Sequence, residues 1–340
     1  MSKLFTPIKI KNLDLKNRIV MAPMCQFSAD EKGFVQNWHF IHYSSRAIGG
    51  VGLILLEATA VDPNGRIMVG DLGIWDDQHI AGLKSIVDEC KKYGAKIGIQ
   101  LFHAGRKCTA PEKESVAPSP IAFSEKYAVP HELTKEEIKE IVVAFRLAAK
   151  RSLGAGFDTI EIHGAHGYLI HQFLSPLSNL RKDEYGGSAE NRVRFLREIL
   201  EAVREVWDKR KALLLRVSAE DYAEGGNTSE DTAYLINLVK EYEIDLVNVS
   251  SGAIVPAEIN VYPGYQITFS EIIRDLTGLP TIAGGLITSP LMAEEILCNQ
   301  RGDLIFIGRD LLRNPYWPLY AAKALDVEME WPNQYRGARL

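Results

Sequence analysis

The sequence predicts a single (β/α)₈ barrel, and three observations support this fold class. Short apolar runs alternate with amphipathic segments along the chain, there are eight such runs, and polar or glycine residues follow each of them. Strict alternation of strands and helices indicates a parallel sheet, and eight units favour closure of that sheet into a barrel. The expected strands are residues 18–22, 52–56, 96–101, 158–163, 213–217, 245–249, 280–283 and 303–307.

The other segments fit one domain that spans residues 1–340. The length of 340 residues would also allow two domains, but barrels often run to about 250 residues as a single domain. Residues 4–15 are expected to form an N-terminal hairpin that plugs one end of the barrel. Two loops are too long for simple connectors: residues 104–132 after the third strand, expected to form a lid, and residues 167–188 after the fourth. A C-terminal tail begins at about residue 326 and ends at residue 340.

The expected helices carry end signals of their own. Residues 80–90 have apolar side chains at helical spacing and are followed by Gly94, a residue type that commonly ends helices. Thr134 and Glu137 have the spacing of a capping box. Ser289 and Pro290 match a cap residue followed by proline at the first helical position. These signals place helices in three of the gaps between the expected strands.

Composition and charge exclude several classes of function. The chain is 46% apolar and 24% charged, and its formal net charge is −5. A negative net charge with scattered basic residues argues against nucleic acid as a partner. The first residues lack the apolar core of a secretory signal, and the run 51–56 is far too short to span a bilayer, so we expect a cytoplasmic protein without a membrane partner. The four cysteines lack zinc or iron–sulfur spacing, and no metal site is expected.

The fourth expected strand ends in His163, His166 and Tyr168, with glycines between them where the chain can turn. A barrel commonly builds its site from such strand ends. The histidines could be metal ligands, acid/base groups, donors to an oxygen or structural residues, although their spacing is not the H-E-x-x-H of zinc proteases. Two imidazole N–H groups would stabilise charge that develops on a carbonyl oxygen. Tyr168 stays protonated at neutral pH and could either donate that proton to a carbon or simply pack its ring.

Other strand ends suggest a bound phosphate compound. Gly285 follows the seventh strand, and Gly308 and Arg309 follow the eighth, where barrels often bind phosphate; the glycines could also serve only as tight turns. Arg216 at the end of the fifth strand requires a partner such as a phosphate or an electron-rich ring. Cys25 after the first strand is either a buried thiol or a polarizable group near a redox cofactor. No G-x-G-x-x-G follows any strand, which favours a mononucleotide over a dinucleotide.

Six stretches carry a family resemblance. They are K-N-R-I-V-M-A-P-M-C at 16–25, G-V-G-L-I-L-L-E-A-T-A-V at 50–61, I-Q-L-F-H-A-G-R-K at 99–107, H-G-A-H-G-Y-L-I-H-Q-F-L-S-P at 163–176, N-x-R-x-D-E-Y-G-G-S at 179–188 and I-G-R-x-L-L-R-N-P at 307–315. On these motifs the chain resembles the Old Yellow Enzyme family of flavin-dependent ene-reductases, and within it the short bacterial subgroup called thermophilic-like. The resemblance runs from residue 4 to about residue 336.

The resemblance implies an FMN enzyme that reduces the activated C=C bond of α,β-unsaturated carbonyl, nitro or maleimide compounds. NADPH or NADH would deliver hydride to the flavin N5 in a ping-pong cycle. The implied catalytic residues are His163 and His166, which hold the substrate oxygen, Tyr168, which protonates the carbon, and Cys25, which tunes the flavin potential. The implied FMN contacts are Ala22, Pro23, Met24, Cys25, Ala58, Gln100, Arg216, Gly285, Gly308 and Arg309. The implied substrate contacts are Phe27, Phe102, His163, His166, Tyr168 and Arg336.

Three positions depart from the subgroup's pattern. Phe27 stands where a tyrosine is usual, Phe102 replaces a common alanine and should narrow the pocket, and Gly164 replaces a more usual alanine. Arg336 matches an arginine that reaches into the site of a neighbouring subunit, which implies a homodimer or homotetramer; it could also be a solvated charge in a tail. Two other functions stay open: a barrel that binds flavin or a phosphate ligand without turnover, and an enzyme like 2,4-dienoyl-CoA reductase that lacks the iron–sulfur domain.

Overall fold

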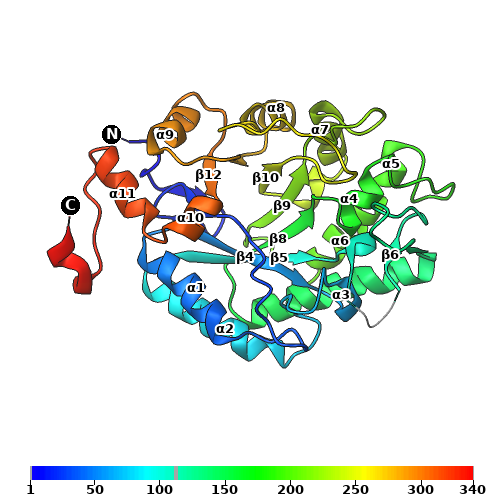
Figure 1. Ribbon diagram of the computed structural model, residues 1–340, viewed down its shortest axis with the longest axis horizontal. Coiled ribbons are helices and arrows are strands. Elements are labelled where there is room, and N and C mark those ends of the chain that lie inside the picture. Colours follow the sequence, from blue (N-terminus) through cyan, green and yellow to red (C-terminus); the bar gives the residue numbers. More distant parts are fainter. Residues whose placement is uncertain (1, 111–113, 340) are drawn as a thin grey trace.

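Eight parallel strands close into a barrel in the computed structural model, which describes residues 2–110 and 114–339 (Figure 1). Their order around the barrel follows the chain, with the last strand pairing with the first. The barrel strands are β3 Ile19–Met21, β4 Leu53–Ala60, β5 Lys96–Phe102, β8 Thr159–Gly164, β9 Leu213–Ser218, β10 Leu246–Ser250, β11 Thr281–Ala283 and β12 Leu304–Ile307. Each overlaps one of the eight expected runs, so the predicted (β/α)₈ barrel is confirmed.

Helices fill the gaps between these strands and cover the outside of the barrel (Figure 1). They are α1 Asn37–Ile48, α2 His79–Lys92, α3 Lys135–Gly154, α4 Leu169–Leu174, α5 Ala189–Arg192, α6 Arg194–Arg204, α7 Ser229–Asn237, α8 Ile267–Thr277, α9 Pro290–Cys298, α10 Arg309–Arg313 and α11 Trp317–Ala324. The predicted capping box of Thr134 and Glu137 is present at the start of α3. Ser289 is the N-cap of α9, but its side chain makes no capping hydrogen bond. None of the described helices is long and apolar enough to cross a bilayer.

The second barrel strand is longer than its apolar run indicated. The expected strand stops before Glu57, whereas β4 continues to Ala60 with a register shift between Leu56 and Ala58. A carboxylate within a buried strand is tolerated here because Tyr43 on α1 donates its hydroxyl hydrogen to Glu57 Oε1 over 3.0 Å. The Tyr43 oxygen in turn accepts from the Glu57 amide. Glu57 is therefore part of the strand and not the first residue after it.

The predicted N-terminal hairpin is also present. β1 Ile8–Ile10 and β2 Leu13–Leu15 pair antiparallel, and Leu13 and Leu15 pack with the barrel residues Val20 and Leu53. The loop after β5 contains two short strands, β6 Val116–Ala117 and β7 His131–Glu132, which pair in parallel. Residues 111–113 of that predicted lid lie outside the described residues. The loop predicted at 167–188 contains α4, because six consecutive residues after Tyr168 are buried and helical.

Candidate active site

The carboxyl end of β8 carries the centre of the site. His163 is buried near the end of this strand, and the chain then turns through His166 and Gly167, whose φ angles are +59° and +68°. The turn brings Tyr168 back to the strand end as the residue that precedes α4. The ring centroid of His163 lies 5.1 Å from that of His166 and 5.0 Å from that of Tyr168. The structure thus brings together the three residues that the sequence predicted as the centre.

His163 offers one N–H group toward its surroundings. Its Nδ1 accepts a hydrogen bond of 3.3 Å from the Ala165 amide, so the proton of the neutral ring lies on Nε2. Burial lowers the pKa of His163 well below its usual value, and the charge of Arg216 lowers it further. The ring is therefore a neutral hydrogen-bond donor at neutral pH.

His166 is held by the neighbouring strand ends. Its Nε2 lies 2.7 Å from Ser250 Oγ at the end of β10, and its backbone amide donates to Ser218 Oγ at the end of β9. Burial lowers the pKa of His166 well below its usual value, with Arg216 as the next cause. When the Ser250 hydroxyl donates to Nε2, the ring proton lies on Nδ1. Both histidines are therefore neutral, and Ser250 fixes the orientation of the second.

Tyr168 presents its hydroxyl beside the two imidazoles. Among the described residues this hydroxyl has no hydrogen-bond partner, whereas the Tyr168 ring packs edge-on against Phe102 at 5.4 Å. Burial raises the pKa of Tyr168 above its usual value. The phenol stays protonated at neutral pH, which is the state that a proton donor requires. Phe102 is fully buried and contacts His163 as well, so it forms one side of the site.

Lys107 clamps the turn that carries His166 and Tyr168. Its Nζ donates to the backbone oxygen of His166 over 2.8 Å and to that of Ala253 over 2.6 Å. It also lies 3.9 Å from the centroid of the Phe123 ring, which belongs to the predicted lid. Burial lowers the pKa of Lys107 to about 7, and Arg106 adds to this effect. Lys107 therefore connects the lid to the site.

Cys25, in the same cluster as Tyr168, has two acidic side chains near it. Cys25 packs with Ala58, Phe102 and Tyr168 in one cluster of side chains. Burial raises the pKa of the Cys25 thiol well above its usual value, and the charges of Asp71 and Glu57 add to this effect. The thiol is therefore protonated at neutral pH. We call Cys25, Glu57 and Asp71 the β4 wall, and His163, His166 and Tyr168 the β8 wall.

A cavity of about 190 Å³ lies beside the two walls. Its lining includes the predicted cofactor residues Arg216, Gly285, Gly308 and Arg309. Gly285 has a φ of +108°, and a side chain there would come within 3.2 Å of Gln266. Arg216 is buried, and its Nε has no hydrogen-bond partner among the described residues. A buried guanidinium beside a glycine-lined cavity fits a ligand with an anionic group and an electron-rich ring, as FMN has.

The remaining predicted cofactor residues occupy the same edge of the barrel. Ala22, Pro23 and Met24 follow β3, and Met24 Sδ lies 3.7 Å from the position of a Cβ built on Gly308. Ala58 lies within β4. Gln100 is buried in β5, where its Nε2 donates to Glu161 Oε1 over 2.6 Å. The side-chain amide of Gln100 is thus a hydrogen-bond donor to a buried carboxyl group inside the barrel.

Two predicted substrate residues are not brought into contact with the β8 wall. Phe27 is 44% exposed and has a φ of +48°. Arg336 is exposed in the short 3₁₀ turn Asn333–Ala338, at the edge of the molecule where Figure 1 marks the C-terminus. Its neighbour Tyr335 instead contacts Tyr316 through the two hydroxyls. Within this chain, Arg336 therefore belongs to the tail and not to the site.

Several polar residues of the site were missed by the sequence reasoning. They are Glu57, Asp71, Lys107, Glu161, His171, Asp221 and Asn248. Glu161 lies two residues before His163, so the two side chains share one face of β8, and a charge inside an apolar run was a usable signal. Glu161 accepts hydrogen bonds from Gln100 and Asn248 across the barrel interior. The others depend on contacts between distant segments and carry no local pattern.

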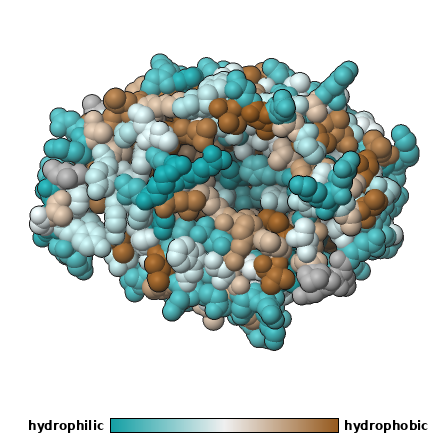
Figure 2. Space-filling view, viewed as in Figure 1, coloured by the Kyte–Doolittle hydropathy of each residue, from teal (hydrophilic) through white to brown (hydrophobic). Residues whose placement is uncertain are grey.

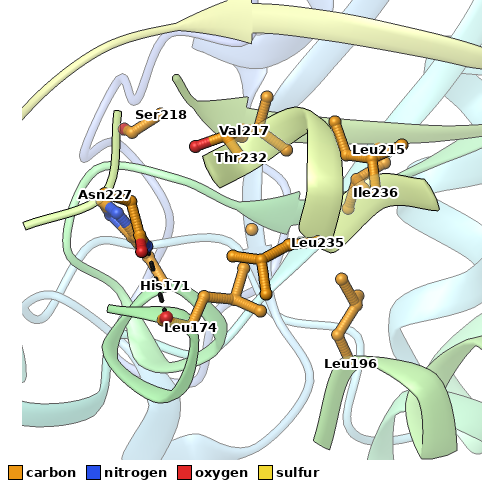
Figure 3. Close-up of a pocket in the computed structure, with 11 residues that line it drawn as sticks. His171, Leu174, Leu196, Leu215, Val217, Ser218, Asn227, Thr232, Leu235 and Ile236 are labelled. Atoms are coloured by element: carbon orange, nitrogen blue, oxygen red, sulfur yellow. Dashed lines mark hydrogen bonds between the residues drawn. The ribbon is translucent and has the colours of Figure 1, made fainter. Parts of the chain in front are cut away.

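Behind β8 and β9 the packing is tight and apolar. Figure 3 shows a cavity between β9, α4, α6 and α7, whose lining includes His171, Leu174 and Leu215. Its volume of about 10 Å³ is marginal even for one water molecule. By contrast, Figure 2 shows a hollow over β8, β9 and β10 with hydrophilic side chains at its base. The exposed hollow, and not the buried cavity, is thus the side on which a ligand can bind.

Comparisons with known proteins agree with this geometry. Residues 3–328 match the model of the NADH:flavin oxidoreductase / NADH oxidase family. NADPH dehydrogenase of Clostridium acetobutylicum is 58% identical, with 99% of each chain covered. NADPH dehydrogenase of Bacillus subtilis is 56% identical, with 98% of each chain covered.

Solved structures extend the comparison. Morphinone reductase aligns with a TM-score of 0.81 and 29% identity over 98% of this chain and 92% of that chain. A 2-naphthoyl-CoA reductase aligns with a TM-score of 0.90 and 29% identity, and covers 95% of this chain but only 52% of its own. The family model, the full-length relatives and the site together show that this chain is a flavin- and nicotinamide-dependent enzyme that belongs to the NADH:flavin oxidoreductase / NADH oxidase family.

Proposed function

We propose that the enzyme is an ene-reductase that reduces the activated C=C bond of α,β-unsaturated carbonyl compounds and of related nitro compounds and maleimides. One observation carries this proposal. A neutral imidazole donor and a protonated phenol, which has no hydrogen-bond partner within residues 2–110 and 114–339, lie with their ring centroids 5.0 Å apart at the carboxyl end of β8. This arrangement can polarise an oxygen and protonate a nearby carbon, the two tasks that reduction of such a bond demands.

Each residue of the β8 wall has a distinct role in this proposal. His163 donates its Nε2–H to the substrate oxygen, and His166, oriented by Ser250, supplies a second contact. Tyr168 transfers its phenolic proton to the carbon next to the carbonyl group. Phe102 restricts the width of the pocket. FMN, when bound, supplies the hydride that it has taken from NADPH or NADH.

The residues around the 190 Å³ cavity hold the cofactor in this proposal. Arg216 faces the ring system, and Gly285, Gly308 and Arg309 surround the phosphate. Ala22, Pro23, Met24 and Ala58 would line the remaining edge of the cofactor, and Cys25 would supply a thiol next to its ring system. The loop at 104–132 acts as a lid, which is supported by the hydrogen bonds of Lys107, a residue of this loop, to the backbone oxygens of His166 and Ala253. Assembly as a homodimer or homotetramer brings Arg336, exposed in this chain, to the site of a neighbouring subunit, whereas Phe27 contacts the substrate of its own chain.

The test separates the two half-reactions. Tyr168→Phe removes only the proton donor, so reoxidation of the reduced enzyme by 2-cyclohexenone should slow by about 10² to 10⁴-fold. Reduction by NADPH in anaerobic stopped flow should change little. Equal losses in both half-reactions would contradict the assignment.

A panel of enones, maleimides and nitroalkenes with either nicotinamide would then define the oxidant. Yellow protein that NADPH bleaches but that no panel member reoxidises would contradict the ene-reductase proposal. Yellow protein that neither nicotinamide bleaches would favour a barrel that binds flavin without turnover. An enzyme like dienoyl-CoA reductase would instead favour CoA thioesters over the free enones.

A further inference from the structure

A buried, hydrogen-bonded pair of side chains, His171 and Asp221, lies directly behind the turn that carries His166 and Tyr168. His171 on α4 places its Nε2 at 2.9 Å from Asp221 Oδ1, and both side chains are buried. On its other side, His171 Nδ1 accepts a 2.9 Å hydrogen bond from the backbone amide of Gly167. Gly167 is the residue between His166 and Tyr168. The pair is therefore joined to the site through one backbone N–H group.

The contacts define where the protons are. Because the Gly167 N–H group occupies Nδ1, the neutral ring carries its proton on Nε2 and donates it to Asp221. Asp221 also accepts from Ser175 Oγ over 2.7 Å and from the Asn227 amide over 2.9 Å. Three donors converge on this carboxylate, so it acts only as an acceptor. Ser175 bonds to the carboxylate and not to the imidazole, which excludes the order of a nucleophilic serine triad.

Gly167 lies in a tight turn that leaves no room for a side chain. Its φ is +68°, and a Cβ built on it would lie 2.1 Å from the backbone oxygen of Ala253. Lys107 binds that same oxygen and the backbone oxygen of His166. The turn is therefore held by Lys107 through the backbone oxygens of His166 and Ala253, and by His171 through the Gly167 amide. Figure 3 shows His171 close to Asn227 and Leu174, on the buried side of this arrangement.

We propose that His171 and Asp221 are positioning residues, whose fixed proton pattern holds Gly167 and thereby sets the placement of Tyr168 against His163. Neither residue touches the substrate. The proposal rests on the proposed function, because placement of Tyr168 matters most in the step in which it gives up its proton. It predicts that exchanging a donor for an acceptor at this pair slows that step without loss of the fold.

Asp221→Asn reverses the donor and acceptor roles in the hydrogen bond between position 221 and His171 Nε2. When the amide oxygen of the new side chain accepts from Ser175 and the Asn227 amide, its NH₂ group faces His171 Nε2. The ring proton then moves to Nδ1, where it opposes the Gly167 N–H group. Loss of the correct tautomer without loss of geometry is known to cost large factors in rate in other histidine–aspartate pairs. We expect reoxidation by 2-cyclohexenone to slow by at least tenfold, with a smaller change in NADPH reduction.

Two substitutions of His171 separate positioning from simple stability. In His171→Asn the amide oxygen lies near the place of Nδ1 and can still accept from Gly167. In His171→Gln the amide nitrogen lies near the place of Nε2 and can still donate to Asp221. A positioning role predicts that His171→Asn is reoxidised faster than His171→Gln. His171→Gln should nevertheless be the more stable variant, because it keeps the hydrogen bond to the buried Asp221 carboxylate. Faster reoxidation of the more stable variant, His171→Gln, would overturn the proposal.

Two further measurements complete the test on the FMN-loaded enzyme. In ¹⁵N NMR, the His171 signals, assigned by their loss in His171→Gln, should show an Nε2–H tautomer that changes in Asp221→Asn. An unchanged tautomer, or Asp221→Asn reoxidised at the wild-type rate, would overturn the proposal. In the Tyr168→Phe background, Asp221→Asn should cost less than threefold, because positioning acts through the phenol. Wild-type enzyme that NADPH reduces but no enone reoxidises would instead refute the proposed function.

Discussion

The buried histidines beside the two walls of the site differ in how their ring nitrogens are matched. On the β8 wall, His163 and His166 each have a hydrogen-bonded ring nitrogen, and His171 behind them has two. Behind the β4 wall, both ring nitrogens of His42 have no hydrogen-bond partner among the described residues, and His39 Nε2 has only a 3.5 Å contact with Glu57 Oε1. Asp71 Oδ1 also has no hydrogen-bond partner within the described part of the chain. Unmatched buried polar groups cost about 1–3 kcal/mol each. Beside the β8 wall, Arg216 Nε and Asn248 Oδ1 are also unmatched among the described residues, so the contrast concerns the histidines and not the two walls as a whole.

The walls also differ in their response to pH. The histidines of the β8 wall are neutral, and Tyr168 is protonated, over the whole neutral range. On the β4 wall, burial raises the pKa of Glu57 to about 7 and that of Asp71 to about 6. Two carboxyl groups beside Cys25 therefore change charge close to neutral pH. The β8 wall provides fixed geometry, whereas the β4 wall provides an electrostatic environment that depends on pH.

Removal of one imidazole from the β8 wall should have the largest effect. His163→Ala removes a preorganised donor, so we expect reoxidation by 2-cyclohexenone to slow by about 10² to 10³-fold, or about 3–4 kcal/mol of activation free energy. Titration with a phenol that binds the oxidised enzyme should show weaker affinity. The matched control is His42→Phe, which keeps an aromatic ring and removes two unmatched nitrogens. Equal losses in both variants would mean that the walls do not differ in this way.

Glu57→Gln tests the pH response of the β4 wall. The pKa of Glu57 is about 7 in the folded state and 4.5 as an ordinary carboxyl group, so the folded protein binds more protons between these values. Glu57 thus costs nothing below pH 4.5, and its cost grows until pH 7 and stays constant above it. The variant should gain up to about 3 kcal/mol relative to wild type between pH 5 and pH 8.

Urea unfolding of the FMN-saturated enzyme at both pH values measures this change. Glu136→Gln, on an exposed position of α3, is the matched control and should follow the wild-type curve. If the free energy of unfolding of Glu57→Gln changes with pH as that of wild type does, Glu57 does not titrate between pH 5 and pH 8. The two walls would then not differ in their response to pH.

Cys25→Ala tests whether the β4 wall acts on the flavin. The thiol is neutral because burial and two nearby carboxyl groups raise its pKa, so it contributes a dipole and not a charge. We expect the flavin midpoint potential to shift by about 30 mV, equivalent to about 1.4 kcal/mol for two electrons. Spectroelectrochemistry measures the shift, and thermal unfolding should change less. A flavin midpoint potential equal to that of wild type within error would mean that Cys25 contributes only to packing.

Local sequence patterns were enough for most of the fold. The eight strands could be predicted because each is a short buried run, and the capping box of Thr134 and Glu137 is a contact between residues three apart. The extension of β4 could not be predicted, because the partner that makes Glu57 acceptable is Tyr43 on a preceding helix. Where a residue's environment comes from another element, its own neighbours in sequence carry no signal.

The same distinction applies to the site. His163, His166 and Tyr168 were identifiable because glycines and titratable residues gather at one strand end. His171 lies in the same motif, but its role depends on Asp221, which follows a different strand 50 residues later. Lys107 likewise acts through the backbone of Ala253 in a distant loop. The donors themselves could therefore be predicted, whereas the groups that hold them required the structure.

Gly164→Ala should have the smallest effect and tests how firmly the β8 wall is held. A Cβ built on Gly164 would lie 3.0 Å from the backbone oxygen of Arg216 and 3.3 Å from Leu215 Cδ1. Leu215 lines the 10 Å³ cavity and can yield into it, whereas the Arg216 oxygen belongs to the neighbouring strand. Alanine also restricts the unfolded chain, which favours the folded state by about 0.4–1 kcal/mol.

The close contact with the Arg216 oxygen and the restriction of the unfolded chain act in opposite directions, and we expect the free energy of unfolding to change by less than about 1 kcal/mol. Phenol affinity should stay within about twofold, because His163 and His166 are held by Ala165, Ser218 and Ser250 and not by the side chain at position 164. Urea unfolding and a spectral titration measure both quantities. A large loss of affinity would show that a shift of a few tenths of an ångström in β9 reaches the histidines, and the β8 wall would then be less rigid than its hydrogen bonds indicate.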